Sequence, residues 1–397
     1  MQERWITDWP VSERWPHYTR ANASEVLPDP ASPLGQQFSW EHGMIPGWRD
    51  AYVHSGNYSI DEFDLDLPQV VGFFGGYVFI NLSNVRMQGI RSPAITLEQL
   101  DLAFFGDHPD VPPHVPHGDD ERPDLLEKAL RHIGWMFTAQ TYPEADAFKQ
   151  DTIALRAGRP DLTTLSDNEL VARARLTQPM LQTGFRHHGI ASSASGVAPG
   201  ILFAIGQAIG DPAMPMTMCA GIGHVDSAEP SYRMWDLSRA VRSSVPLTAV
   251  FDAGVDGLLD RLGADDSPDA AAFLSSWDQF LVDFGSRGLS EWEMTSATWE
   301  TEPELALGAL NQIRHQNDEE SPLIRNQAKA DERAAKTAEV RAVVAALGNE
   351  ELNAQLEGAI VATNQLGFRE RTKTNLVRVV HEGRMAFREL GRRHAEA

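Results

Sequence analysis

The sequence has almost no cysteine, since Cys219 is the only one in 397 residues. A single cysteine cannot form a disulfide within the chain, and without a cysteine pair there is no thiolate zinc site. A metal site would therefore need histidine and carboxylate ligands. The histidines of the segment 106–123 (His108, His114 and His117) have irregular spacing and no regular scaffold. We therefore interpret that segment as a solvated loop and expect no bound metal.

Long apolar runs and basic residues are also scarce. No stretch reaches the roughly 18 consecutive apolar residues that span a bilayer, and the start, MQERWITDWPVSERW, lacks a signal-peptide core. We therefore expect a cytoplasmic protein with no membrane partner. Lysine and arginine total 34 against 56 aspartates and glutamates, which gives a formal net charge of −22. We expect no nucleic-acid partner, because phosphate binding needs a dense basic surface.

Residues 1–105 carry the strand signals of the chain. The first 32 residues are rich in tryptophan and proline, so we expect an extended segment that buries its aromatic side chains. A helix is expected to start near Pro33. The run VVGFFGGYVFINLS (70–83) contains two β-branched and aromatic stretches around Gly75 and Gly76, which is typical of a β-hairpin. Residues 1–105 as a whole are expected to form part of the acceptor pocket.

The rest of the chain reads as a loop followed by helices. Residues 106–123 hold five prolines and a run of acids, which predicts a linker or long surface loop. From 124 to 397 the apolar spacing is helical, with Ser166 and Glu169 forming a capping box. The Ala-, Lys- and Glu-rich stretch 326–346 predicts a long, exposed helix. We thus expect a mainly α protein with a large helical domain and a small β-hairpin element near the N-terminus.

The segment LGFRERTKTNLVRVV (366–380) concentrates basic residues in an acidic chain. At about 100° per residue, Arg369 and Lys373 continue the apolar stripe of a helix, whereas Arg371 and Arg378 face the opposite side, toward solvent. Burying two like charges without a partner is costly, so an anionic group should lie against the inward pair.

The inward pair has two interpretations. A planar guanidinium and a compact ammonium suit a phosphoryl group, whose transfer depends mainly on positioning and charge neutralisation. Glu370 would then orient Arg369 or accept a proton from an attacking hydroxyl. Alternatively, both cations pair with acids on neighbouring helices. The spacing alone leaves both interpretations open.

Three stretches together resemble the middle, substrate-binding region of the phosphoenolpyruvate synthase and rifampin phosphotransferase family. YTRANASEVLPDPASPLG (18–35) is similar to that family's Thr-Arg-x-Asn-x-x-Glu-x-x-Pro-x-Pro-x-x-Pro-Leu segment, and FGSRGLSEWEMTSATWETEP (284–303) to its Tyr-Gly-x-Arg-Gly-x-x-Glu-x-Asp segment. Phe284 and Glu293 replace the Tyr and the Asp. The third match is Arg-Glu-x-x-Lys in the segment 366–380.

The resemblance implies roles for particular residues. Arg369 and Lys373 would receive a phosphoryl group from a carrier histidine, and Glu370 would activate or orient the acceptor hydroxyl. These three are the candidate catalytic residues. The candidate substrate-binding residues are Arg20, Asn22, Phe38, Arg287 and Glu291.

Each of the substrate-binding candidates also has a structural interpretation. Arg287 and Glu291 are four residues apart, as in a helical salt bridge. Arg20 and Asn22 could belong to the cap of the first helix. Phe38 suits either a pocket for an apolar or aromatic acceptor or the hydrophobic core.

In the family that this chain resembles, an ATP-grasp domain phosphorylates a histidine on a swivelling carrier domain. The carrier motif, Gly-Gly-x-x-Ser-His-Ala-Ala, has no match here, and GIGHVDSAE (221–229), which contains His224, reads as a turn between helices. We therefore expect an acceptor-binding phosphotransferase component that binds no cofactor itself. ATP-grasp and phosphohistidine proteins would act in trans on a small hydroxylated substrate. The alternatives are a dehydratase component, which eliminates the phosphorylated hydroxyl, and a non-catalytic ligand-binding or scaffold protein.

Overall fold

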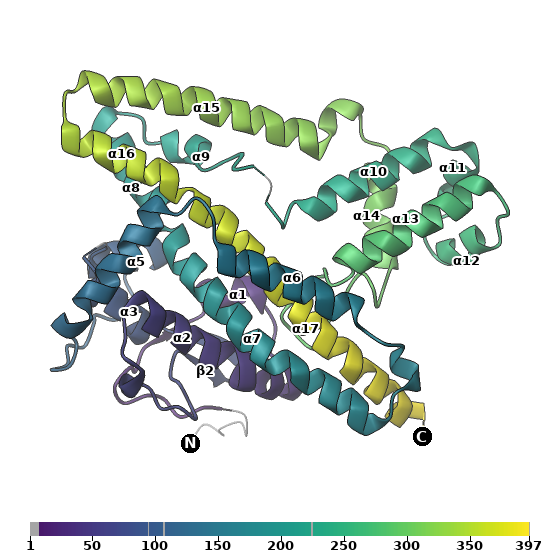
Figure 1. The fold of residues 1–397 in the computed structure, drawn as a ribbon, viewed down its shortest axis with the longest axis horizontal. Coiled ribbons are helices and arrows are strands. Elements are labelled where there is room, and N and C mark those ends of the chain that lie inside the picture. The colour runs from purple at the N-terminus through teal and green to yellow at the C-terminus, as the bar shows by residue number, and fades with distance from the viewer. Residues whose placement is uncertain (1–7, 94, 106–107, 224, 397) are drawn as a thin grey trace. The chain divides into compact units, whose positions relative to one another are not determined.

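The computed structural model describes residues 8–93, 95–105, 108–223 and 225–396. Trp5 and His224 lie outside this part of the chain. The described chain is mainly helical, as predicted, with one small antiparallel sheet (Figure 1). It divides into two compact units: unit 1 is 1–197, 292–295 and 375–397, and unit 2 is 198–291 and 296–374. These boundaries differ from the expected division into 1–105, 106–123 and 124–397, because both of the first two segments lie within unit 1.

Unit 1 contains the sheet and the N-terminal helices, which pack around one hydrophobic core. Its strands are β1 (Tyr18–Thr19), β2 (Val71–Phe74) and β3 (Tyr77–Asn81). Its longer helices are η1 (Gly35–Met44), α2 (Ile45–Ser55), α3 (Leu82–Arg91), α4 (Leu97–Phe105), α5 (Leu126–Thr138), α6 (Pro143–Ala157) and α7 (Asp167–Ser195). Its short helices are α1 (Ala23–Val26), η2 (Ile60–Glu62), η3 (Pro123–Leu125) and η4 (Leu162–Thr164).

The predicted hairpin is confirmed. Strands β2 and β3 pair antiparallel with Phe74 opposite Tyr77, and Gly75 and Gly76 between them both have positive φ. Two consecutive positive φ values are what a tight hairpin turn of this kind requires. The sequence did not predict β1, whose two residues pair with the other edge of β3.

Gly75 offers a direct test of this turn. Its φ is +58°, and no atom beyond Gly75 and its two chain neighbours lies within 4 Å of the position that an added Cβ would take, so a methyl group there would meet backbone strain and no clash. We expect Gly75→Ala to lower the free energy of unfolding by about 1 kcal/mol, because L-residues disfavour this conformation. Gly75→Asn, which tolerates it better, should cost less. Urea unfolding would measure both, and equal effects of Ala and Asn would contradict the assignment.

The N-terminal segment and the first long helix build the core of unit 1. Trp9 and Trp15 are buried, as predicted for the aromatic side chains of the segment 1–32. The expected helix near Pro33 also forms, but residues 35–44 adopt the wider π conformation before α2 begins at Ile45. Helix α2 then lies against α7. The capping box of Ser166 and Glu169 at the start of α7 is confirmed.

The described part of the predicted loop is 108–123; residues 108–122 contain no helix or strand, and Pro123 begins η3. It is nevertheless anchored within unit 1, because Asp120 is buried and lies 2.5 Å from Arg14 Nη2 and 2.9 Å from His114 Nε2. The side chain of Arg91 also donates to the Asp120 carbonyl at 2.7 Å. The side chain of His117, by contrast, pairs with the exposed Asp119. The imidazoles of His114 and His117 therefore have different carboxylate partners.

Unit 2 is helical and holds two smaller cores. One core lies among α10, α11, α12, α13 and α14, and the other among α8, α9, α15 and α16. The helices of this part of the chain are α8 (Val197–Ile209), α9 (Met214–Met218), α10 (Glu229–Ser243), α11 (Val245–Asp252), α12 (Leu258–Gly263), α13 (Pro268–Phe284), α14 (Glu304–Ile313), α15 (Pro322–Ala346) and α16 (Glu350–Ala362), with the short 3-10 helix η5 (Asp318–Glu320) before α15. Helix α15 is long and largely exposed, as predicted, with only Val340 and Val344 buried.

One helical stretch in the described chain, Asp167–Ile209, is long and apolar enough to span a membrane by length and composition. This stretch includes α7, whose residues Leu170, Ala174, Leu181 and Phe185 are buried in the hydrophobic core of unit 1. Burial of this kind is what the core helix of a soluble protein shows. Length and apolar composition therefore carry little weight for a membrane assignment here.

Candidate functional site

The predicted catalytic residues lie on α17 (Asn364–Glu396), the last helix of the chain (Figure 1). Residues 364–374 of this helix belong to unit 2 and the remainder to unit 1. In the unit 2 part of the helix, Phe368 and Thr372 are buried. They are four residues apart, so they lie on the same face of the helix. Thr372 Oγ1 donates to the carbonyl of Phe368 at 2.9 Å, so its hydroxyl is satisfied within the helix.

Arg369, Glu370 and Lys373 form one partly exposed turn beside this buried face. The side chains of Arg369 and Glu370 are 39% and 27% exposed, and Arg369 Nη1 lies 3.4 Å from Glu370 Oε1. Lys373 is half-buried and has no hydrogen-bond or ion-pair partner among the described residues. The predicted alternative, in which both cations pair with acids on neighbouring helices, therefore finds no support at Lys373.

The expected orientation of the other cations was wrong. Arg371 was expected to face solvent, but its Nε lies 3.3 Å from Oδ1 of Asp226, which is buried in unit 2. Arg378, in the unit 1 part of the helix, is half-buried and its Nη1 donates to Asn375 Oδ1 at 3.3 Å. The helical projection failed because it counted apolar residues alone, whereas a buried aspartate supplies a partner for a cation on the other face.

Arg287 and Glu291 form the ion pair that their spacing predicted, with Nε and Oε1 2.8 Å apart. They do not lie in a helix, since α13 ends at Phe284 and the pair sits in the following loop. The two side chains are 18% and 11% exposed. The loop is held in unit 2 by an isolated bridge between Gly288 and Thr298. The ion pair between Arg287 and Glu291 therefore helps to fix the conformation of this loop.

Arg20 and Asn22 lie in unit 1. Arg20 Nη2 donates to the carbonyls of Leu27 and Pro28 at 2.8 and 3.2 Å, and its guanidinium stacks 4.4 Å from the ring centroid of Tyr77. Asn22 precedes α1 at the N-cap position, but its side chain makes no capping hydrogen bond. Its φ of +66° is the only positive value at a non-glycine residue in the described chain. Both residues thus shape the turn that leads into α1.

Phe38 belongs to the core of unit 1. Its side chain is buried, and its ring meets that of Phe387 edge to face with centroids 4.9 Å apart. Of its two predicted interpretations, the structure therefore supports the core. A ring buried in this way offers little surface to a ligand.

Glu293 and Ser32 form a contact in unit 1 that sequence reasoning missed. Glu293 is buried, and its carboxylate accepts hydrogen bonds from Ser32 Oγ at 2.5 Å and from Thr295 N at 3.1 Å. Arg384 Nη2 also donates to the Glu293 carbonyl at 2.6 Å. Ser32 and Glu293 both lie in segments that carry the family resemblance. That resemblance was the signal in the sequence that could have pointed to this contact.

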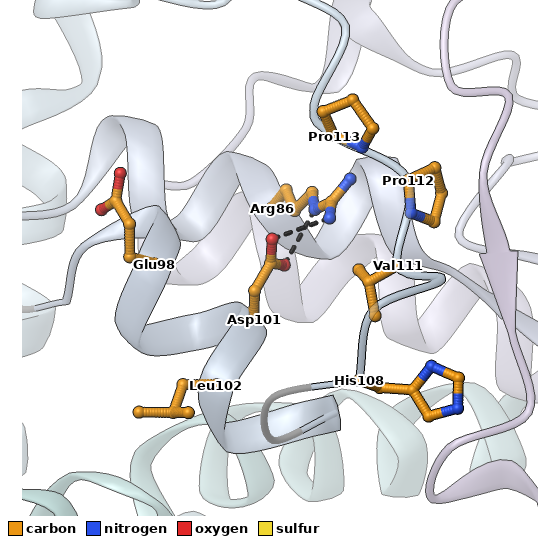
Figure 2. A pocket seen from close by; sticks show the side chains of 8 residues that line it. All are labelled: Arg86, Glu98, Asp101, Leu102, His108, Val111, Pro112 and Pro113. Atoms are coloured by element: carbon orange, nitrogen blue, oxygen red, sulfur yellow. Dashed lines mark hydrogen bonds and ion pairs between the residues drawn. The ribbon is translucent and has the colours of Figure 1, made fainter.

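The structure also contains a shallow surface pocket of about 390 Å³ in unit 1 (Figure 2). Arg86 and Asp101 face each other in its wall and form a two-pronged ion pair, with Nε–Oδ1 and Nη2–Oδ2 distances of 2.9 and 2.7 Å. The remaining wall comes from α4 and the segment 108–113. None of the predicted site residues lines this pocket, so we do not assign the predicted chemistry to it.

Part of the chain is similar to a known protein family. Residues 188–370 match the family model described as the rifampicin phosphotransferase fourth domain. The match covers a little under half of the chain, includes Arg369 and Glu370, and ends three residues before Lys373. It confirms the resemblance to that region of the family. Comparison with curated proteins gives no match to the chain.

Proposed function

From the premise that this chain contains a region of the rifampicin phosphotransferase fourth-domain type, we propose that it is the acceptor-binding component of a phosphohistidine-dependent phosphotransferase. It would bind a small hydroxylated molecule and present one hydroxyl for phosphorylation. The observation that carries the proposal is the turn of α17 that holds Arg369, Glu370 and Lys373. There, a lysine ammonium without a partner among the described residues lies on the same turn as an arginine and a carboxylate.

The chemistry follows from these three groups. The acceptor oxygen would form a bond to phosphorus as the bond from phosphorus to the carrier histidine nitrogen breaks. The hydroxyl proton would pass to the Glu370 carboxylate, which is 27% exposed and so accessible to a ligand. Arg369 and Lys373 would neutralise the charge on the transferring oxygens, where fixed donors are most effective.

The partners of this component follow from what its own residues supply. The candidate site provides charge neutralisation and a base, and it requires a phosphorylated histidine as donor. We therefore propose that ATP-grasp and phosphohistidine carrier proteins act in trans, with ATP used by the partner and no cofactor held by this chain. The acceptor is proposed to be a small hydroxylated apolar or aromatic molecule, by analogy with the name of the matched family.

A reconstitution tests this function. The purified chain would be mixed with ATP and with separately produced ATP-grasp and carrier domains of a rifampicin phosphotransferase, using rifampicin and a panel of hydroxylated aromatic compounds as acceptors. We expect phosphorylated product, detected by mass spectrometry, only when all components are present. We also expect no phosphate on the chain alone, since it has no carrier-type motif.

Other outcomes of the same experiment point to the other functions. Stable phosphate on a histidine of this chain would contradict an acceptor-only component. A product that has lost the hydroxyl together with a neighbouring proton would indicate a dehydratase component. Ligand binding without turnover, with a carrier shown to be phosphorylated, would indicate a non-catalytic binding protein.

A further inference from the structure

Arg86 is a buried cation that lines the surface pocket of unit 1. Its side chain is 0% exposed, and it lies in the wall of the pocket of about 390 Å³ (Figure 2). Its Nε and Nη2 atoms are bound to the carboxylate of Asp101, whereas Nη1 is buried without a hydrogen-bond partner among the described residues. A buried donor without a partner is costly, and an acceptor atom of a ligand would remove that cost.

The local sequence brings α3 and α4 together at this pocket. Gly89 of α3 lets the backbone at the start of α4 approach closely, since a Cβ added to it would lie 2.8 Å from the Cα of Leu97. Helix α4 then begins with reciprocal hydrogen bonds between Thr96 and Gln99, at 2.9 and 3.2 Å. Two helices of fixed conformation therefore position the side chain of Arg86 in the absence of any ligand.

The remaining walls of the pocket are largely apolar. Figure 2 shows Arg86 Nη1 on the side away from Asp101, toward Pro112 and Pro113. Proline has no backbone N–H, so these two residues present apolar surface without a backbone donor. Leu102 of α4, which is 56% exposed, adds further apolar surface to the lining. The pocket therefore combines a donor that lacks a partner with walls that suit an apolar group.

The charged side chains of the lining favour a neutral ligand. Asp101 already balances the charge of Arg86, and the exposed Glu98 adds a second carboxylate. A carboxylate or phosphate ligand would be repelled by these two acidic groups. A carbonyl oxygen carries no net charge, so it can accept a hydrogen bond from Arg86 Nη1 without this repulsion.

We propose that this pocket binds a small neutral molecule with a carbonyl oxygen on an apolar or aromatic body, and that the carbonyl accepts from Arg86 Nη1. Because Nη1 is buried, binding requires a small outward shift of Pro112 and Pro113, which no helix or strand holds in place. The site lies entirely in unit 1 and shares no residue with the proposed phosphoryl-transfer residues of α17. It therefore stands or falls independently of the proposed function.

Fluorine NMR of three matched probes tests the site on the full chain. The probes are para-fluorobenzamide, para-fluorobenzoate and para-fluorotoluene, which share one ring and offer a neutral carbonyl, an anion and a methyl group respectively. We expect the amide to show saturable line broadening with a Kd of roughly 1 mM, as suits so small a ligand. The other two probes should bind at least about 5-fold more weakly. Equal binding of the three probes, tighter binding of the benzoate or toluene, or no saturable binding of the amide would overturn the proposal.

Two variants assign the binding to this pocket. Arg86→Lys keeps a cation for Asp101 but removes the planar fork, so the preference for the amide over the toluene should fall to about 2-fold or less. Leu102→Ala should weaken the amide and the toluene by a similar factor of roughly 3 to 5, because it removes apolar contact alone. Leu126→Ala is the matched control, since Leu126 is exposed on α5 of the same unit and does not line the pocket. Amide binding of wild-type strength in Leu102→Ala would overturn the assignment, even if Arg86→Lys fails to fold.

Discussion

Replacing Lys373 by Met is expected to slow phosphoryl transfer by about 10², equivalent to about 3 kcal/mol of transition-state stabilisation. The methionine keeps an unbranched side chain and good helix propensity, so it removes the charge with little change of shape. Because Lys373 has no ion-pair partner among the described residues, unfolding stability should change by less than roughly 0.5 kcal/mol. The measurements are the transfer rate in the reconstituted system and urea unfolding of the variant.

Lys329→Met provides the matched control for this prediction. Lys329 is an exposed lysine on α15 of the same unit, so the same substitution there should change neither rate nor stability. Arg378 is a poorer control, because it is half-buried and bonded to Asn375. A destabilised Lys373→Met protein that still transfers phosphate normally per folded molecule would assign Lys373 a structural role and remove it from the site.

The second large effect is a loss of stability on acidification. His132 and His187 are both buried in unit 1, and burial lowers the pKa of each to about 4, with smaller contributions from His54 and Arg186 respectively. His132 Nε2 and His187 Nδ1 have no hydrogen-bond partner among the described residues, as expected for neutral rings packed against other aromatic rings. Both histidines should therefore stay neutral in the folded protein at pH 5.

The sign follows from proton linkage. The unfolded chain binds a proton at each histidine near pH 6.5, whereas the folded chain does so only near pH 4, so stability is full above pH 6.5 and falls between these values. At pH 5 the expected loss is about 2 kcal/mol for each histidine. Urea unfolding at pH 7.5 and pH 5 measures the difference.

His187→Phe isolates this contribution. A phenyl ring preserves contact with the rings of Tyr142 and Phe148 and has no group to protonate, so the drop in stability between pH 7.5 and pH 5 should shrink by about 2 kcal/mol. The control is His315→Phe, at an exposed histidine of unit 2, which should leave the pH dependence unchanged. An unaltered pH dependence in His187→Phe would mean that the pKa of His187 is not lowered in the folded protein.

Local signals in the sequence predicted local structure well. Gly75 and Gly76 set the hairpin because the turn needs two positive φ values, and few other residues adopt them readily. Ser166 and Glu169 set the start of α7 because their side chains satisfy backbone N–H groups within one turn. In both cases the interacting groups are close in sequence, so no knowledge of the remaining fold was needed.

Contacts between distant segments were not predictable in the same way. The strand β1 is only two residues long, and it exists because β3 offers an edge with which it can pair. The widening of residues 35–44 into a π-helix has no signal in the sequence that we recognise. The partner of Arg371 is Asp226, 145 residues away, so a projection of one helix could not identify it.

By itself, then, the sequence determined the mainly helical class, the hairpin, the exposed α15 and the motifs that carry the family resemblance, because each depends on residues within a few turns of one another. Only the tertiary structure decided which cations have partners. It paired Arg371 with Asp226, left Lys373 without a partner among the described residues and bound Arg86 of α3 to Asp101 of α4. Charge pairing depends on distance in space and on burial, and neither is encoded in the spacing of residues along one helix.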